Sequence, residues 1–385
     1  TMKLRTKLLI GGEWSEGSDR FPTVNPATEE VIAEIEEAGE PEVDAAVRSA
    51  REAFENPKWR HMDPHRRAAL LWRLADLVEE NADFIAETET RDNGKPLFES
   101  GKVDVPFVVA NLRYFAGWAD KLTGDVIPVS GNFLNYTLRE PVGVVGAIVP
   151  WNFPLNIASW KVAPALACGN AVILKPAEQT PLTALLLGEL ALEAGFPAGV
   201  LNVIPGRGPV TGQALVEHPG VDKICFTGST ETGRRVMRAA AAGPTKVSLE
   251  LGGKSPNVVF ADADLDAAVK GALTGIFYGK GEVCAAGSRL LVERSVRDEF
   301  VEKLAERAKS MTVGDPTDAK TRIGALVSAE QRDKVLRYID YGREDGARLV
   351  AGGRPVDVGG KGFFVEATVF DEVDPDMRIA REEIF

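Results

Sequence analysis

A single cysteine stands in a stretch of small residues whose types suit covalent chemistry. Cys284 follows Gly279 and Gly281 and precedes Gly287, and a short apolar run at residues 290–292 comes next. Glycines and small side chains around one thiol predict a loop that opens onto a cleft, followed by a strand. A thiol on such a loop can be reached by a substrate, and its thiolate is a nucleophile. The alternative is a small apolar residue at a loop-to-strand junction, which is the commoner role of an isolated cysteine.

Two further side chains have types that assist a nucleophile. Asn152 lies between Trp151 and Phe153 in an apolar turn bounded by prolines, so its amide either bonds to the backbone or faces a ligand. As a donor, this amide would stabilise an oxyanion. Glu250 ends an apolar strand before two glycines. It is therefore either a solvated strand end or a general base beside a cleft.

Three other positions suit a nucleotide. Residues 228–233 (Gly-Ser-Thr-Glu-Thr-Gly) join a strand to a helix, whose exposed N–H groups would suit a pyrophosphate. This stretch lacks the third glycine of the dinucleotide fingerprint, so an ordinary turn explains it as well. Lys175 is placed to reach a phosphate or ribose, and Glu178 to accept ribose hydroxyl groups, although a solvated Lys/Glu pair is the alternative. A carboxylate there would repel the 2′-phosphate of NADP, so NAD is favoured over NADP.

These residues all follow predicted strands of an α/β pattern. Near-continuous apolar strands are predicted at residues 143–149, 171–174, 200–204, 223–226 and 246–249, with helices at 155–168, 181–193, 210–216 and 230–242. Such alternation indicates a doubly wound parallel sheet that helices cover on both faces. Ligands gather at the carboxyl ends of the strands in such sheets. The strand ends therefore bring a set of polar or small residues to one edge of the sheet: Asn152, Lys175, Gly228, Ser229 and Glu250.

The rest of the chain predicts a ribbon and a second domain. Residues 66–89 have the periodicity of one long helix, and residues 123–141 read as a two-stranded ribbon. A ribbon alone buries too little to be stable, so it must lie on another domain or subunit. A second alternation of strands and helices begins near residue 251. We therefore predict a dinucleotide-type domain of residues 1–122 and 142–250, a ribbon of residues 123–141 and a second α/β domain of residues 251–385.

The composition limits the classes of function. The 385 residues include 45 Lys+Arg and 57 Asp+Glu, which gives a formal net charge of −12, and the chain has no basic run. We therefore expect binding neither to nucleic acid nor to an anionic membrane. No apolar run reaches the length of a membrane span, and the first residues lack the apolar core of a signal peptide. The three cysteines and three histidines have no metal-ligand spacing, so we expect a cytoplasmic protein without a metal.

Taken together, these stretches resemble the NAD(P)-dependent aldehyde dehydrogenase superfamily, and they are most similar to its hydrolytic, broad-specificity and betaine-aldehyde group. The resemblance covers nearly the whole chain. It is carried by residues 150–154 (Pro-Trp-Asn-Phe-Pro), 175–181 (Lys-Pro-Ala-Glu-Gln-Thr-Pro), 226–230 (Phe-Thr-Gly-Ser-Thr), 249–256 (Leu-Glu-Leu-Gly-Gly-Lys-Ser-Pro), 284–289 (Cys-Ala-Ala-Gly-Ser-Arg) and 382–385 (Glu-Glu-Ile-Phe).

The resemblance implies oxidation of an aldehyde to a carboxylic acid with NAD⁺. It implies that Cys284 is the nucleophile, which forms a thiohemiacetal and then a thioester, and that Glu250 activates water. Asn152 and the backbone N–H of Cys284 would form the oxyanion hole. The implied cofactor contacts are Trp151, Lys175, Glu178, Gly228, Ser229, Glu383 and Phe385. The implied substrate-tunnel positions are Phe153, Ile157, Trp160 and Tyr278. The resemblance further implies that residues 1–122 and 142–250 bind NAD, that residues 123–141 are an oligomerisation ribbon of a homodimer or homotetramer, and that residues 251–385 form the catalytic domain.

Two departures from the family pattern stand out. Asn156 lies where relatives carry an aliphatic side chain, which predicts a more polar tunnel. The family pattern also continues past Phe385, so we expect the catalytic domain to be incomplete at its C-terminus.

Other functions remain open at this stage. A CoA-acylating dehydrogenase would pass the acyl group to CoA, and Glu250 argues against it. A cysteine hydrolase would lack a histidine partner in the motif region. A non-catalytic NAD-binding fragment or structural family member would bind nucleotide without turnover.

Overall fold

The computed structural model describes residues 2–385, which form two compact units. Unit 1 contains residues 2–23, 33–85 and 102–250, and unit 2 contains residues 24–32, 86–101 and 251–385. The chain therefore passes between the units within β3 (Asp19–Val24), β4 (Val31–Glu37) and α4 (Ala82–Asn93). The first domain predicted from the sequence included residues 24–32 and 86–101, which pack with unit 2; the functional assignment of the domains stays a prediction.

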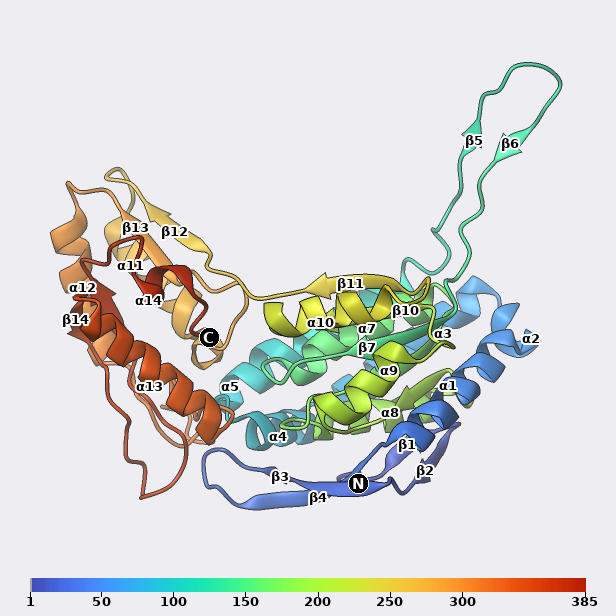
Figure 1. Ribbon diagram of the computed structural model, residues 1–385, viewed down its shortest axis with the longest axis horizontal. Coiled ribbons are helices and arrows are strands. Elements are labelled where there is room, and N and C mark those ends of the chain that lie inside the picture. Colours follow the sequence, from blue (N-terminus) through green and yellow to red (C-terminus); the bar gives the residue numbers. More distant parts are fainter. Residues whose placement is uncertain (1) are drawn as a thin grey trace. The chain divides into compact units, whose positions relative to one another are not determined.

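Unit 1 is built on a seven-stranded sheet with the strand order β11-β10-β7-β8-β9-β1-β2. Figure 1 labels β1, β2, β7, β10 and β11 of this sheet. Its strands are β1 (Leu8–Ile10), β2 (Glu13–Ser15), β7 (Val144–Ile148), β8 (Ala171–Lys175), β9 (Leu201–Val203), β10 (Lys223–Thr227) and β11 (Lys246–Glu250). The five strands from β7 to β11 run parallel, whereas β1 pairs antiparallel with both β9 and β2. This sheet confirms the predicted α/β fold class.

Helices cover the sheet on both faces. They are α1 (Glu40–Glu55), α2 (Pro57–Arg60), α3 (Pro64–Glu80), α6 (Val105–Ala116), α7 (Pro154–Ala167), α8 (Leu182–Ala194), α9 (Gln213–Glu217) and α10 (Thr230–Ala240). Right-handed crossovers place α7 and α8 on one face, and the return to β10 places α9 and α10 on the other. Every residue of β7 and β8 is buried, because both faces of these strands lie under helices.

The strand order reverses next to β7, and this position matters for ligands. The chain moves from β7 to β8 and β9 on one side, and then returns to β10 and β11 on the other. In open α/β sheets, ligands bind outside the carboxyl ends of the strands at such a switch point. The turn after β7 and the turn after β10 both lie there.

The predicted ribbon is present as a hairpin of two short strands, β5 (Val126–Ile127) and β6 (Asn135–Tyr136), which pair antiparallel (Figure 1). All residues of both strands are exposed. The hairpin also exposes large apolar side chains, namely Val126, Ile127, Val129, Phe133, Leu134, Tyr136 and Leu138. Apolar area of this extent on one arm is typical of an interaction surface.

Unit 2 combines small sheets with helices. Its elements from residue 251 onward are β12 (Pro256–Val259), α11 (Leu265–Phe277), β13 (Arg289–Val292), α12 (Arg297–Lys309), α13 (Ala329–Glu344), β14 (Arg348–Ala351), β15 (Val369–Asp371) and α14 (Arg378–Arg381), together with α5 (Leu97–Glu99) from the earlier segment. Strands β12 and β13 pair parallel, and β14 and β15 pair antiparallel. Helices α11 and α12 enclose a core around Val269 and Phe300, which are both fully buried.

The long helix predicted over residues 66–89 is two helices in the structure. Helix α3 ends at Glu80 and α4 begins at Ala82. Asn81 lies between them, where its side chain donates to the carbonyl of Leu77 at 2.8 Å. Asparagine commonly bonds to nearby backbone in this way and ends a helix, although the apolar periodicity continues across it.

Within residues 2–385, none of the helices is both long and apolar enough to cross a bilayer. The same residues contain no group of three or more His, Cys, Asp or Glu side chains placed to hold a metal ion.

Candidate active site

The strand register of unit 1 brings several predicted site residues to one edge of the sheet. Lys175 at the end of β8 pairs with Ile148 of β7, and Glu250 at the end of β11 pairs with Thr227 of β10. Gly228 follows directly, and its N–H donates to the carbonyl of Glu250 at 3.1 Å. The sequence predicted one shared edge for these residues, and the turns after β7 and β10 at this edge lie at the switch point of the sheet.

Asn152 lies in the turn between β7 and α7. It is only 4% exposed, whereas its neighbours Trp151 and Phe153 are half-buried. Pro154 begins α7 directly after this turn, where a proline is favourable because its missing N–H has no helical partner to lose. The proline therefore fixes the start of the helix and with it the turn that holds the amide.

Lys175 and Glu178 form a partly buried pair. The Lys175 ammonium lies 3.5 Å from a carboxylate oxygen of Glu178, and their side chains are 3% and 34% exposed. Burial lowers the pKa of Lys175, and the negative charges of Glu178 and Glu37 oppose that change. The pair therefore offers a cation and a partly accessible acceptor side by side at the end of β8.

Ser229 caps helix α10. Its hydroxyl accepts a hydrogen bond from the Thr232 N–H at 3.2 Å, so the helix begins directly behind Gly228 and Ser229. The first turn of a helix presents backbone N–H groups and the positive end of the helix dipole. Ser229 is exposed, so this positive end is open to a ligand.

Glu250 is exposed at the end of β11. Lys161 of α7, which the sequence analysis did not single out, interacts electrostatically with Glu250. Burial lowers the pKa of Lys161, and the negative charge of Glu250 opposes that change. A signal for Lys161 was present, because it is the one charged residue in the sequence of the otherwise apolar α7. Ionisable groups with a perturbed pKa are common at functional sites.

The predicted tunnel residues of unit 1 lie on α7 and differ in exposure. Trp160 is 45% exposed, whereas Ile157 is 1% exposed. The Trp160 ring packs on the ring of Phe107 from α6, with 6.2 Å between centroids. Phe107 is itself 46% exposed.

Asn156 is buried on the same helix. It is 8% exposed, and its side-chain oxygen has no hydrogen-bond partner among residues 2–385. A buried polar atom without a partner costs free energy, so such atoms are often satisfied by a ligand or water. This favours the predicted polar character of the tunnel.

In unit 2, Cys284 is half-buried and follows a 3₁₀ turn, Tyr278–Gly281. The sequence predicted an open loop here, yet two of its charged residues are buried. Lys280 is 7% and Glu282 is 1% exposed, and their charged groups lie 2.7 Å apart. Burial lowers the pKa of Lys280 and raises that of Glu282, and each charge opposes the change in the other. The thiol therefore follows a closed, buried turn.

Glu383 lies close to the Cys284 loop. Its carboxylate accepts a hydrogen bond from the Gly253 N–H at 3.1 Å, and a side chain at Gly252 would collide with the same carboxylate. A Cβ at Gly253 would lie 3.3 Å from the Cys284 carbonyl oxygen, so this glycine contacts both residues. The two glycines after Glu250 are thus explained by close packing within unit 2.

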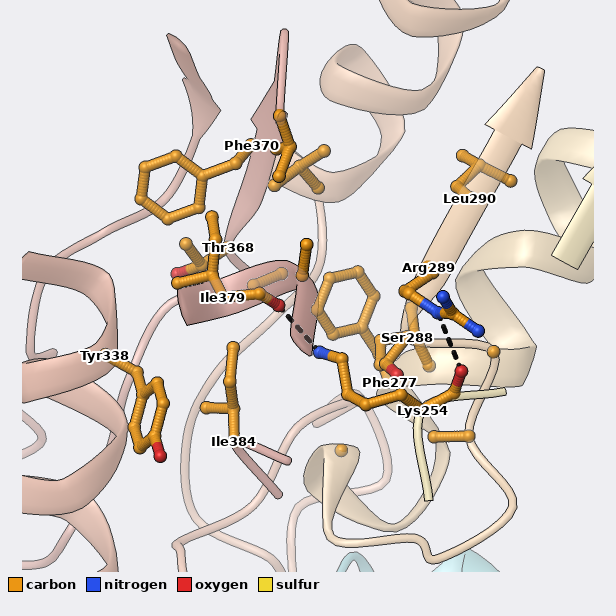
Figure 2. Close-up of a pocket in the computed structure, with 18 of the residues that line it drawn as sticks. Lys254, Phe277, Ser288, Arg289, Leu290, Tyr338, Thr368, Phe370, Ile379 and Ile384 are labelled. Carbon is orange, nitrogen blue, oxygen red and sulfur yellow. Dashed lines mark hydrogen bonds between the residues drawn. The ribbon is translucent and has the colours of Figure 1, made fainter. Parts of the chain in front are cut away.

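The residues around this point are held by further hydrogen bonds. The Lys254 ammonium donates to the Ile379 carbonyl at 2.7 Å, and Arg289 Nε donates to the Lys254 carbonyl at 2.8 Å (Figure 2). The Gln331 side-chain nitrogen donates a hydrogen bond to the Phe385 carbonyl at 2.7 Å. The segment that carries Glu383 and Phe385 is therefore tied to α13 and α14.

A cavity of about 840 Å³ lies within unit 2. Figure 2 shows Phe277, Tyr338, Phe370 and Ile379 around it, and Val283 also lines it. Cys284 itself is not among the residues that line it. The predicted site residues consequently fall into two groups, one at the sheet edge of unit 1 and one around the Cys284 loop of unit 2.

Comparison with known proteins identifies the class to which this fold and these two groups belong. The sequence model of the Aldehyde dehydrogenase family matches residues 14–385. Retinal dehydrogenase 2 of Gallus gallus is 52% identical over 99% of this chain and 74% of its own length. A putative aldehyde dehydrogenase, DhaS, of Bacillus subtilis (strain 168) is 50% identical over 98% of this chain and 77% of its own length.

Solved structures agree. The structure of an aldehyde dehydrogenase from Bacillus cereus in complex with NAD⁺ has a TM-score of 0.97 and is 48% identical over 99% of this chain and 77% of that chain. The chain belongs to the aldehyde dehydrogenase family. The predicted NAD(P)-dependent aldehyde dehydrogenase activity is thereby confirmed.

Proposed function

We propose that Cys284 is the nucleophile of the aldehyde oxidation, that Asn152 stabilises the oxyanion and that Glu250 is the general base. The observation that carries the proposal for Asn152 and Glu250 is their common sheet edge in unit 1, because the turn with Asn152 follows β7 at the switch point and Glu250 ends β11 beside β10. Membership of the family supports the three roles together.

The residues at the same edge fit a dinucleotide. The open N-terminus of α10 at Ser229 suits a pyrophosphate, and Lys175 with Glu178 suits the hydroxyl groups of a ribose. We assign Trp151, Gly228, Glu383 and Phe385 to the same cofactor on the family resemblance. The Glu178 carboxylate disfavours a 2′-phosphate, so NAD⁺ is the preferred cofactor.

The reaction proceeds in two halves. The Cys284 thiolate adds to the aldehyde carbon, and the carbonyl oxygen becomes the oxyanion of a thiohemiacetal. The Asn152 amide and the backbone N–H of Cys284 donate to that oxygen, and the loss of one such donor typically costs about a hundred- to a thousandfold in rate. NAD⁺, when bound, accepts the hydride that leaves the adduct. Cys284 then carries the acyl group as a thioester.

Hydrolysis completes the cycle. Glu250 takes a proton from a water molecule, whose oxygen attacks the thioester carbon, and the Cys284 thiolate leaves as the carboxylic acid forms. Hydride loss and water attack thus use different residues. The two halves can therefore be separated by mutation.

Glu250→Ala tests the assignment of the base. We expect this variant to form about one equivalent of NADH per active site in the first turnover, and then to turn over at least a hundredfold more slowly than the wild type. Rapid-mixing absorbance at the NADH band measures both phases. Glu299→Ala, at an exposed position on α12, is the matched control and should keep both phases.

Two results would contradict this assignment. One is an unchanged steady rate in Glu250→Ala. The other is a wild-type rate that rises on addition of CoA, which would mean that CoA rather than water accepts the acyl group.

The exposed apolar ribbon supports the formation of a homodimer or homotetramer, in which β5 and β6 pack on another subunit.

The three cysteines are free thiols, which supports a cytoplasmic location. Exclusion of labelled protein from membrane and organelle fractions would test that location.

The substrate is an aldehyde with a polar group near the carbonyl. The Asn156 side-chain oxygen, which has no hydrogen-bond partner among residues 2–385, supports this preference.

A further inference from the structure

The turn before Cys284 has a backbone shape that ordinary side chains avoid. Gly279 has φ 57° and ψ 27°, Lys280 has φ 65° and ψ 17°, and Gly281 has φ 82°. Left-handed backbone of this kind is natural for glycine but unfavourable for a residue with a Cβ atom. Lys280 therefore stays in this conformation only because other contacts hold it there.

The Lys280 ammonium supplies such contacts. It donates to the Asn93 carbonyl at 2.7 Å and to the Asn93 side-chain oxygen at 3.0 Å, and it lies 2.7 Å from a Glu282 carboxylate oxygen. An ammonium group has three N–H donors, and three acceptors surround this one. The side chains of Lys280 and Glu282 are each 1% exposed, so these bonds are formed away from solvent.

The same turn is tied to two other segments of unit 2. The second carboxylate oxygen of Glu282 accepts from the Val327 N–H at 3.1 Å. The Gly279 N–H donates to the Glu99 carboxylate at 3.1 Å, and the Glu282 N–H closes the turn on the Gly279 carbonyl at 3.1 Å. Cys284 comes two residues after Glu282, so its backbone direction is set by this anchored turn.

Stability alone does not account for a buried ion pair. The cost of removing two charges from water cancels much of their attraction, so an apolar pair of similar volume is often as stable. What the pair provides in addition is a fixed geometry, because each polar atom accepts only a narrow range of positions for its partners.

We propose that Lys280 is a positioning residue for Cys284, and that its ammonium, held by Asn93 and Glu282, fixes the turn that orients the Cys284 thiol and backbone N–H. Lys280 makes and breaks no bond in the reaction. The inference rests on the proposed role of Cys284 as the nucleophile.

Two variants separate positioning from stability. Lys280→Met removes the ammonium and leaves the Glu282 carboxylate buried without its cation. Lys280→Met combined with Glu282→Gln removes both charges, while the amide oxygen that the second substitution introduces can still accept from the Val327 N–H. Phe300→Leu, in the buried core of α12, is the matched control for a loss of stability in unit 2.

We expect Lys280→Met to lower both the Tm and kcat. The double variant should regain most of the Tm, because the Glu282 carboxylate no longer lies buried without its nearest cation, but its kcat should stay roughly ten- to a hundredfold below the wild type. The KM for the aldehyde and the Kd for NAD⁺ should change little, and the first-turnover NADH phase should slow with kcat. Phe300→Leu should lower the Tm and keep kcat.

The proposal would be overturned if the double variant had the kcat of the wild type. It would also be overturned if the kcat of the double variant fell no further than that of Phe300→Leu, when the two proteins have the same Tm. Cys284→Ala, measured in parallel, distinguishes a failure of the proposed function from a failure of the positioning role of Lys280. If Cys284→Ala stays active, the proposed function itself fails. If Cys284→Ala is inactive and the Lys280 variants keep their kcat, only the positioning role fails.

Discussion

At the scale of the residue, the buried amide of Asn156 has the clearest consequence for substrate choice. Its oxygen lacks a hydrogen-bond partner among residues 2–385, and it lies on the helix that carries Trp160. A site that bonds to a polar substrate group discriminates strongly against analogues that lack it, because its own polar atom is then left unpaired. The preference of this chain should therefore depend on this one side chain.

Asn156→Leu should shift selectivity toward apolar aldehydes. We expect the ratio of kcat/KM for hexanal over that for glycolaldehyde to rise about tenfold or more, because one hydrogen bond in a buried site is worth about 1–2 kcal/mol. Steady-state NADH formation with the two aldehydes measures this ratio. Asn202→Leu is the control, because the Asn202 side chain already bonds to Gly11 and Gly199. An unchanged ratio in Asn156→Leu would show that the amide does not face the substrate.

Some site residues could be predicted from the sequence and others could not. The positions of Lys175 and Glu250 at strand ends and of Asn152 in the turn after β7 were predictable, because the carboxyl ends of parallel strands meet at one edge. Lys280 and Glu282 were not predictable, because charged residues between glycines usually indicate an exposed loop. Lys280 is bonded to Asn93, which is far away in the sequence. The residue pattern around Lys280 cannot predict such a distant contact.

At the scale of the element, the end of β4 is fixed to the turn after β9 by one ion pair. The Arg207 guanidinium donates to the Glu37 carboxylate at 2.8 and 3.0 Å, and the Arg207 backbone N–H also donates to it at 2.8 Å. The hydrogen bond from the Arg207 side chain is the largest cause that lowers the pKa of Glu37. The Glu37 charge also acts on Lys175, so this contact supports the predicted cofactor lysine.

The lowered pKa of Glu37 predicts a pH dependence of stability. The group contributes stability above its unfolded pKa of about 4.3, and that stability is lost as the pH falls through the lower folded value. Arg207→Gln should therefore lower the Tm at pH 7 and reduce the further loss of Tm between pH 5 and pH 3. Thermal melts monitored by circular dichroism measure both effects.

Arg73→Gln serves as the control for this pH dependence, because its pair with Glu80 is exposed on α3. If Arg207→Gln and the wild type lost the same Tm between pH 5 and pH 3, the Glu37 contact would not contribute to the acid sensitivity.

The elements themselves differ in how far the sequence predicts them. The strands β7, β8 and β10 lie within about one residue of their predicted ranges, because they are buried runs between glycine or proline turns. The break at Asn81 was missed, because the apolar spacing of α3 and α4 is continuous across it. The packing of residues 24–32 and 86–101 with unit 2 was also missed, because it results from contacts with residues beyond 251.

At the scale of the whole molecule, the ribbon predicts the state of assembly. Phe133 and Leu134 are 79% and 76% exposed, which is unusual for side chains of this size on an arm with no core of its own. We expect the wild-type chain to run as a dimer or tetramer in size-exclusion chromatography with light scattering. Phe133→Gln combined with Leu134→Gln should shift it toward the monomer.

Met237→Gln is the matched control for this shift, because Met237 is also exposed but lies on α10, away from the hairpin. The oligomeric role of the ribbon would be ruled out by a ribbon variant that keeps the mass of the wild type, or by a wild-type chain that is already monomeric.

The most direct test of the central claim is NADH formation by this chain and by Cys284→Ala. The chain is mixed with NAD⁺ and a short panel of aliphatic and aromatic aldehydes, and NADH is followed by absorbance while NAD⁺ binding is measured by calorimetry. We predict NADH formation with the wild type, none with Cys284→Ala, and similar NAD⁺ affinity for both. Equal NADH formation by the two proteins would contradict the role of Cys284, and NAD⁺ binding without NADH formation by the wild type would identify a nucleotide-binding protein that does not catalyse the oxidation.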